Sequence, residues 1–149
     1  MAHIDWLDSY YCNIEIIDEQ HLNILKLINQ LDDAVTDRNR EVVGRLLNEI
    51  IATVISHFEF EEELMAASGF GHLKAHKKLH DRSVEKLVNF SQRYDTGECI
   101  IEEFHPFLQK WFTHHMEEDK DYCVSAAAEM NAQQNKKKGW FARTFGGRG

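Results

Sequence analysis

Two pairs of residues able to bind metal ions lie close together in this sequence, and each pair has a spacing of four. His57 and Glu61 belong to the segment HFEFE, and His76 and His80 belong to HKKLH. On an α-helix a step of four residues is a rotation of about 400°, so both side chains of a pair project from nearly the same face. Two such pairs on neighbouring helices would direct four ligands at one spot. The spacing therefore predicts half of a buried metal site.

Histidines in the first and last helical segments supply the other half of this site. His21 lies in an apolar stripe with a spacing of three to four residues, and His115 and Asp119 continue a similar stripe near the end of the chain. In the second segment, His57 and Glu61 occupy positions where apolar side chains are expected, and burying a carboxylate is costly unless it is paired or bound to metal. A single histidine in such a stripe is usually a packed core residue, but a histidine in every stripe indicates a metal site.

The composition of the ligand set favours two iron ions. Its members are His21, His57, Glu61, His76, His80, His115 and Asp119. The set has more nitrogen ligands than a single tetrahedral zinc ion can bind, and no cysteines have the spacing of a zinc site. Imidazoles and carboxylates in this proportion suit two six-coordinate ions of borderline hardness, bridged by the carboxylates, and iron is the natural choice.

Four amphipathic helices are expected to position these residues. The chain has one Pro and eight Gly, so long helices are possible almost throughout. Apolar stripes and turn residues place the helices from near Asp18 to residues 37–40, from about Val43 to Ser68, from Leu73 to Thr96 and from Ile101 to near Asn131. The short connections predict an all-α fold, an antiparallel up-down-up-down four-helix bundle.

Two segments flank the expected bundle. Residues 1–17 hold bulky apolar side chains without helical periodicity, which predicts an extended N-terminal arm laid over the bundle. We assign residues 1–131, including this arm, to one domain and residues 132–149 to a basic, aromatic C-terminal tail. Within it, residues 136–149 are either a disordered solubilising end or a short docking segment for an anionic membrane surface or an acidic partner.

Charge and cysteine usage limit the classes of function. The formal net charge is −8, and residues 136–149 contribute five positive charges and no negative one, which leaves −13 on the rest of the chain. An acidic body argues against nucleic acid as a partner. Cys12, Cys99 and Cys123 are an odd and scattered set, which predicts reduced thiols in a cytoplasmic protein. The sequence leaves the oligomeric state open.

Four motifs resemble those of the hemerythrin family, in particular the single-domain bacteriohemerythrins. They are IDEQH ending at His21, HFEFEEELM from His57, HKKLH from His76 and WFTHHMEEDKDY from Trp111, and the resemblance covers about residues 5–125. It implies a four-helix bundle that binds O2 reversibly at a non-haem centre of two iron ions (Fe2+/Fe3+) with an oxo or hydroxo bridge.

The resemblance also implies roles for the ligands. One iron would be bound by His76, His80 and the histidine of the last helix. The other would be bound by His21 and His57 and would keep an open position for O2. Glu61 and Asp119 would bridge the two ions.

The sequence departs from the family pattern at two places. Asn13 replaces a Gly, which is a mild change because Asn tolerates left-handed backbone. In the last motif the family has Asp five residues after its histidine, a spacing that His114 has to Asp119, whereas His115 is four residues before it. We choose His115 because it lies four residues after Trp111 and continues the apolar stripe, and His114 stays the alternative.

Three classes of function are compatible with such a centre. The first is an oxygen carrier, store or delivery protein, with no catalytic residues, which could serve an oxygen-consuming protein. The second is a sensor of O2 or redox state that acts through a separate partner. The third is a di-iron oxidase, peroxidase or nitric oxide–handling enzyme, which the HxxxE and HxxxH spacings disfavour because ferritin-like di-iron enzymes use Glu-x-x-His motifs. Two of the other histidines, His72 and His105, lie at or near helix starts and are expected to be solvated or capping.

Overall fold

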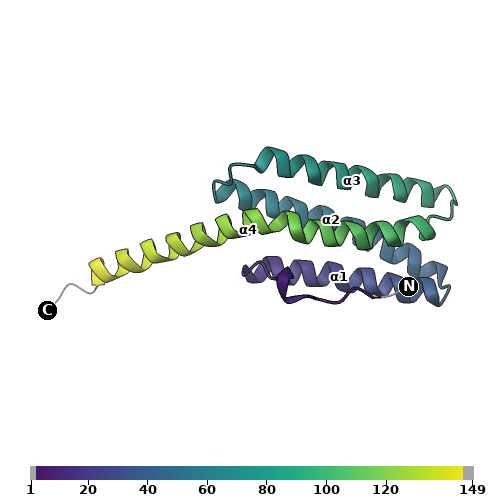
Figure 1. Ribbon diagram of the computed structural model, residues 1–149, viewed down its shortest axis with the longest axis horizontal. Coiled ribbons are helices and arrows are strands. Elements are labelled where there is room, and N and C mark those ends of the chain that lie inside the picture. Colours follow the sequence, from purple (N-terminus) through teal and green to yellow (C-terminus); the bar gives the residue numbers. More distant parts are fainter. Residues whose placement is uncertain (1–2, 146–149) are drawn as a thin grey trace.

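The computed structural model describes residues 3–145 and contains four long helices, with no strand in that part of the chain (Figure 1). The helices are α1 (Glu15–Thr36), α2 (Arg40–Ala67), α3 (Leu73–Asp95) and α4 (Ile101–Phe145), and a short 3-10 helix, η1 (Asp8–Tyr10), precedes them. The all-α fold predicted from the stripes is confirmed.

Successive helices run in opposite directions, because each connection joins neighbouring ends of the bundle (Figure 1). The connections are short, and their ends are built by residues suited to stopping or starting a helix. The side chain of Asn39 accepts a hydrogen bond from the N–H of Val42 at the start of α2, as an N-cap does. Gly69 and Gly97 have φ values of 71° and 87° just after α2 and α3, a backbone region that favours glycine.

The N-terminal arm lies along the bundle, as predicted, but it is shorter than expected because α1 begins at Glu15 and not near Asp18. The backbone N–H of Ile4 donates to the side chain of Asn29 on α1, and the ring of Tyr10 packs edge-on against Phe112 of α4. Asn13 has a φ of 64°, which confirms that left-handed backbone is needed where the arm turns into α1.

Helix α4 is longer than the sequence predicted. It continues past Asn131 to Phe145, and its last part projects from the bundle (Figure 1). Ala126 is the last of its fully buried residues within the described part. The stretch after Asn131 is rich in Ala, Gln and Lys, which favour a helix without any tertiary contact. The helix therefore continues although the apolar periodicity of its sequence ends. Residues 146–149 lie outside the described part.

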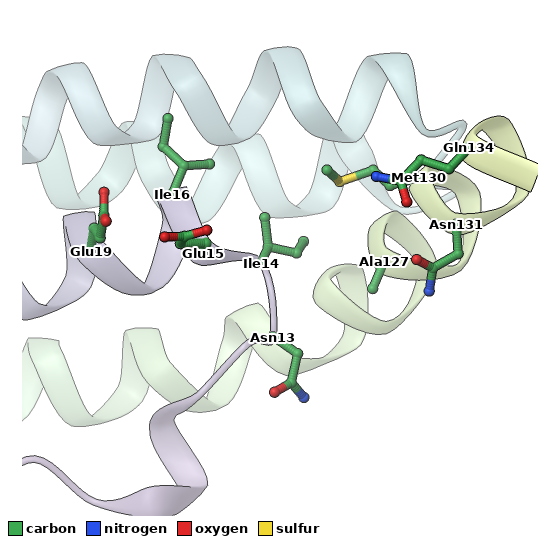
Figure 2. Close-up of a pocket in the computed structure, with 9 residues that line it drawn as sticks. All are labelled: Asn13, Ile14, Glu15, Ile16, Glu19, Ala127, Met130, Asn131 and Gln134. Atoms are coloured by element: carbon green, nitrogen blue, oxygen red, sulfur yellow. The ribbon is translucent and has the colours of Figure 1, made fainter. Parts of the chain in front are cut away.

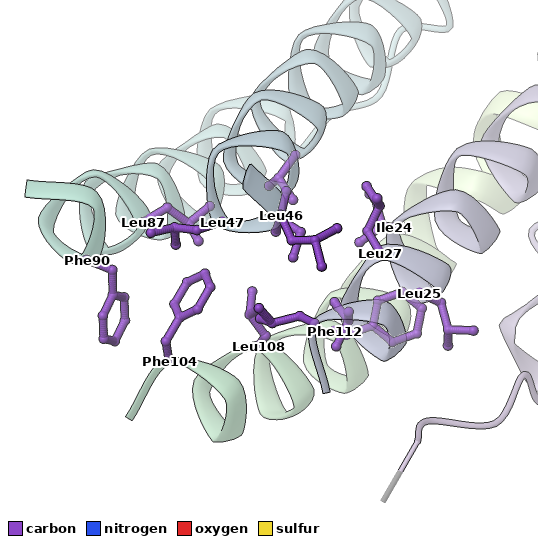
Figure 3. Close-up of a cluster of buried hydrophobic side chains, with 14 of the residues drawn as sticks. Ile24, Leu25, Leu27, Leu46, Leu47, Leu87, Phe90, Phe104, Leu108 and Phe112 are labelled. Atoms are coloured by element: carbon purple, nitrogen blue, oxygen red, sulfur yellow. The ribbon is translucent and has the colours of Figure 1, made fainter. Parts of the chain in front are cut away.

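Two apolar clusters fill the bundle, and the predicted metal ligands lie between them along its length. The larger cluster draws on all four helices and includes Ile24, Leu47, Leu87 and Phe104 (Figure 3). The smaller one, which we call the apolar lid, consists of Ile14, Ile17, Met65, Tyr122, Cys123 and Ala126. The centre is therefore enclosed by apolar side chains on both sides along the bundle axis.

The prediction of three reduced cysteines was wrong. Cys12 of the arm and Cys123 of α4 form a disulfide, and Cys99 is free and exposed. The two bonded cysteines are 111 residues apart in sequence, so only the position of the arm against α4 shows that they are neighbours.

The prediction that His105 is solvated or capping was also wrong. Its side chain is buried, and its Nε2 lies 3.5 Å from Oδ1 of Asp32, another buried residue, across the interface between α4 and α1. Pro106 and the adjacent turn suggested a helix start, but His105 is already the fifth residue of α4 and faces inward. His72 is exposed at the start of α3 and its side chain makes no cap hydrogen bond.

None of the helices described is long and apolar enough to cross a membrane.

Candidate metal centre

The seven predicted ligands converge on one place in the middle of the bundle. They come from α1 (His21), α2 (His57 and Glu61), α3 (His76 and His80) and α4 (His115 and Asp119), and each is at most 6% exposed. The pairs spaced by four lie on inward faces, as the rotation of an α-helix requires. All seven side chains that the sequence predicted as ligands therefore lie in one buried cluster.

The two carboxylates occupy the middle of this cluster, and each turns its two oxygens to different histidines. Oε1 of Glu61 lies 2.7 Å from Nε2 of His57, whereas Oε2 lies 3.0 Å from Nε2 of His80. Oδ2 of Asp119 lies 2.9 Å from Nε2 of both His21 and His115, whereas Oδ1 lies 3.2 Å from Nε2 of His76. Each carboxylate thus directs one oxygen to each side of the cluster, an arrangement that would suit a bridge between two cations.

The histidines divide into a group of three and a group of two. His21, His57 and His115 form the first group and His76 and His80 the second, and Glu61 and Asp119 belong to both. The resemblance implied another division, in which the histidine of the last helix joins His76 and His80. In this structure Nε2 of His115 lies 3.0 Å from Nε2 of His57, and which of the two ions each histidine binds stays a prediction.

The two adjacent histidines of α4 differ in burial and in their contacts with the carboxylates. The side chain of His115 is 1% exposed and reaches both carboxylates, whereas His114 is exposed and lines a surface groove with Lys110 and Arg82. His115 and Asp119 share a face because α4 is a regular α-helix there, and a step of four residues keeps side chains aligned. A ligand spacing of five would need a wider turn.

Several buried polar atoms of the cluster lack a hydrogen-bond partner. They are Nδ1 of His21, Nε2 of His76, Nε2 of His80, Oε2 of Glu61 and both carboxylate oxygens of Asp119. The close nitrogen–oxygen contacts of these atoms do not have the geometry of hydrogen bonds. Such groups are rare in folded proteins because each costs about 1–3 kcal/mol when left unsatisfied. Imidazole nitrogens and carboxylate oxygens facing one another in this way fit a pair of bound cations, and imidazole with carboxylate suits iron.

Burial and the charges of neighbouring ligands shift the pKa values of the side chains in this centre. Burial lowers the pKa of His115, but the charges of Asp119 and Glu61 outweigh it and hold that pKa well above its usual value. Burial raises the pKa of Glu61, but the charges of His115 and His57 outweigh it and hold that pKa well below its usual value. Burial dominates at His57 and lowers its pKa.

Three residues that sequence reasoning did not assign to the site hold the ligands in position. Nδ1 of His57 donates to Oε1 of Gln20 over 2.7 Å, and Nδ1 of His80 donates to Oε1 of Glu62 over 3.3 Å. The hydroxyl of Tyr122 donates to Oε1 of Glu61 over 2.7 Å.

These contacts fix which ring nitrogen faces the cluster, which is how outer partners orient metal-binding histidines. Gln20 precedes His21 and Glu62 follows Glu61. Their neighbours in sequence could have drawn attention to them, although the rotation of each helix decides the contact. Glu62 is a half-buried partner of His80.

Aromatic rings cover the cluster on the side toward the larger core. Phe58 stacks on His80 with ring centroids 3.9 Å apart, and Trp111 stacks on His115 with centroids 5.1 Å apart. Trp111 is itself fixed by a hydrogen bond from its Nε1 to Oγ of Ser83 on α3. The other surroundings are apolar as well, since Ile24, Ile28, Val54 and Leu108 are buried and Leu64 is half-buried.

Comparison with known proteins agrees with this geometry. Residues 12–123 match the family model of the hemerythrin HHE cation binding domain. The bacteriohemerythrin of Stenotrophomonas maltophilia is 33% identical over 148 residues, and the alignment covers 97% of each chain. The bacteriohemerythrin of Methylococcus capsulatus is 30% identical over 131 residues, which are 85% of this chain and 100% of the relative.

Solved structures give the same answer. The crystal structure of wild-type hemerythrin superposes with a TM-score of 0.78 at 28% sequence identity, and the match covers 84% of this chain and 98% of the other. The family model spans the arm's end, all four helices of the bundle and the whole ligand set. The chain therefore belongs to the hemerythrin family.

Proposed function

We propose that this protein binds O2 reversibly at a centre of two iron ions, for the carriage, storage or delivery of oxygen. The observation that carries the proposal is the convergence of five buried histidines on two buried carboxylates, Glu61 and Asp119, which face histidines on both sides. Such a set leaves one iron with fewer protein ligands than the other. When bound, a pair of ferrous ions with an oxo or hydroxo bridge supplies two electrons to O2 and recovers them on release.

The protein's own residues would hold the ions, exclude water and fix the ligand atoms. As the resemblance implies, His76, His80 and His115 would bind one ion, and His21 and His57 would bind the other, which would have room for O2. Glu61 and Asp119 would bridge them, since each faces both groups of histidines. Burial of all seven side chains supports reversible binding, because a dry pocket keeps solvent from the bound ligand.

An oxygen-binding protein accounts for this site better than an enzyme does. The buried surroundings contain one hydroxyl close to the carboxylates, that of Tyr122, and burial raises its pKa far above the usual range. Tyr122 therefore stays protonated, and its hydroxyl donates a hydrogen bond to Glu61. Such a group is poorly suited to proton transfer. We also propose a cytoplasmic location and no role in nucleic-acid binding.

A spectroscopic titration tests this function. The protein is purified, loaded with ferrous iron under argon and titrated with O2. Its iron content is measured in parallel, and we expect two irons per chain. We expect a visible absorption band that grows with O2 and disappears under vacuum over repeated cycles. Rapid one-way conversion to the ferric form, with release of peroxide, would instead indicate an oxidase or a sensor.

Two single substitutions test the ligand assignment on α4. We expect His115→Ala to lose iron and the absorption band, and His114→Ala to retain both, because only His115 faces the carboxylates. The two residues are adjacent, so each variant is the control for the other. Iron loss confined to the His114 variant would refute the assignment.

The projecting end of α4 favours a docking role in addition to oxygen binding. Lys136, Lys137, Lys138 and Arg143 carry its charge, with no acidic residue after Glu129, and Trp140 is 55% exposed. We propose that this end attaches the protein to an anionic membrane surface, and that an oxygen-consuming protein is the alternative partner. Deletion of residues 136–149 should abolish co-sedimentation with anionic lipid vesicles at low salt, and unchanged binding would exclude the membrane.

A further inference from the structure

The disulfide between Cys12 and Cys123 joins the N-terminal arm to the helix that carries part of the metal centre. Cys123 directly follows Tyr122, whose hydroxyl donates to the bridging carboxylate of Glu61. It lies one turn of α4 after Asp119, the second bridging carboxylate. The covalent link therefore ends beside the two residues that hold both cations together.

The same link closes the apolar lid over one end of the centre. Cys123 belongs to the lid with Ile14 and Ile17 of the arm and α1, and Cys12 packs against it. Ile17 is 0% and Ile14 is 4% exposed, so this part of the chain is a seal between the centre and solvent. Opening the link would remove the covalent fastening of that seal.

Few other contacts hold the arm at this point. The N–H of Cys12 donates to Oδ1 of Asp18 over 2.7 Å, and Asn13 then takes left-handed backbone to lead into Ile14. A non-glycine residue in that region stores strain unless its surroundings enforce it. The disulfide and the burial of Ile14 are what enforce it here.

Of the two bonded cysteines, Cys12 is the more exposed residue. Cys12 is half-buried and its neighbour Asn13 is exposed, whereas Cys123 is 3% exposed. A groove of about 410 Å³ opens beside them, and Asn13 and Ile14 line it opposite Ala127 and Met130 of α4 (Figure 2). Cys12 directly precedes Asn13 in the chain, so an incoming thiol at this groove would approach Cys12, and attack on its Sγ would make Sγ of Cys123 the leaving group.

We propose that Cys12 and Cys123 are a redox-active pair that a cellular dithiol reduces, and that their reduction loosens the apolar lid over the metal centre. The thiolate of the reductant bonds to Cys12 and expels Cys123 as a thiolate, which takes up a proton. The second thiol of the reductant then displaces Cys12, so the protein gains two thiols and the reductant becomes a disulfide. A disulfide in a reducing compartment is usually of this transient or sensing kind.

The consequence for oxygen rests on the proposed function. With the lid fastened, the centre is sealed and the oxygenated protein is long-lived. With the lid loosened, water reaches the centre and the oxygenated protein decays to the ferric form faster. The thiol state of the cell would then set how long this protein holds its oxygen.

Thiol counting and limited proteolysis test the pair without reference to oxygen. The iron-loaded full-length protein is treated with dithiothreitol and its thiols are counted without denaturant. We expect the count to rise from one, Cys99, to three, and to return to one after the reductant is removed in air. Cleavage within residues 3–14 should accelerate on the order of tenfold on reduction, because a locally opened segment is cut faster.

Serine variants then test the effect on the centre without any reductant, which would itself reduce iron. Cys12→Ser and Cys123→Ser should each convert from the oxygenated to the ferric form several-fold faster than the parent, and Cys99→Ser should match the parent. A pair that stays oxidised until the protein is denatured, or opens with no change in cleavage of the arm, would overturn the redox proposal. Equal decay in all variants would overturn the link to the centre, whereas absence of any reversible oxygenated form would count against the proposed function alone.

Discussion

At the scale of single residues, the centre depends on hydrogen bonds that come from outside the ligand set. Three such partners, Gln20, Glu62 and Tyr122, each form a hydrogen bond with a predicted ligand on a different helix. Loss of such outer partners typically lowers metal affinity 10–100-fold. These residues therefore separate retention of iron from integrity of the fold.

Replacing Tyr122 with Phe should weaken iron binding while leaving the bundle folded. The ring still fills its place in the apolar lid, but Glu61 loses its hydroxyl donor. We expect about a tenfold loss of affinity, measured by competition with a chelator, and unchanged far-ultraviolet circular dichroism. Tyr11→Phe, at an exposed tyrosine of the arm, is the matched control. Equal affinities for the two variants would mean that the hydroxyl does not position Glu61.

Iron affinity should fall as the pH is lowered through and below neutrality. The pKa of His115 is raised in the metal-free protein by Asp119 and Glu61, so a proton occupies the cluster that metal must displace. The metal-free state thus binds more protons than the metal-bound state, and acid favours the former. We expect about a tenfold weaker affinity per pH unit for each proton displaced, measured by chelator competition across pH 5–8. A pH-independent affinity would show that no proton is displaced.

At the scale of helices, the larger apolar cluster fixes how the four ligand-bearing faces meet. Leu47 of α2 is 0% exposed and lies in that cluster (Figure 3). The other members of this cluster come from all four helices, so the register of α2 against the rest of the bundle depends on this packing. The positions of His57 and Glu61, further along α2, follow from the same register.

Truncating Leu47 to Ala should destabilise the protein by about 2–5 kcal/mol, because it removes buried methyl groups and leaves a cavity. Val88→Ala on α3, at a residue that is 39% exposed, should change stability by less than about 0.5 kcal/mol. Urea denaturation of the two variants measures the difference. A loss below about 1 kcal/mol for Leu47→Ala would show that this part of the bundle collapses readily around the gap.

Helices and ligands were readable in the sequence because both follow from local periodicity. The four-residue spacings of His57 with Glu61 and of His76 with His80 fix a shared face whatever the fold around them. Contacts between distant segments were not readable in this way. The Cys12–Cys123 bond and the His105–Asp32 contact depend on how the arm and α4 rotate about the bundle, which no local pattern encodes. The assignment of each histidine to one of the two ions likewise came only from the family resemblance, because it depends on the positions of all four helices.

At the scale of the whole molecule, an acidic bundle carries a basic helical extension. The extension lies beyond the last fully buried residue described, Ala126, and beyond the family match, which ends at Cys123. Stability of the bundle should therefore be independent of it. The assignment of residues 132–149 to a separate tail stays a prediction, since α4 passes without interruption from one part to the other.

Removing residues 136–149 should leave the melting temperature within about 2 °C of the parent, since exposed residues away from the core contribute little. Iron content should be unchanged as well. Differential scanning calorimetry and metal analysis on the full-length and shortened proteins measure both. A large drop in melting temperature would place the extension against the bundle.

The uninterrupted course of α4 also gives the molecule a lever. Asp119 lies 26 residues before the end of the helix at Phe145, a length of about 39 Å at 1.5 Å per residue. A tilt of about 5° at the bridging carboxylate would carry the far end through roughly 3 Å, provided that the helix stays straight. A change too small to alter the packing of the bundle would thus become a displacement that a membrane or a bound partner can register.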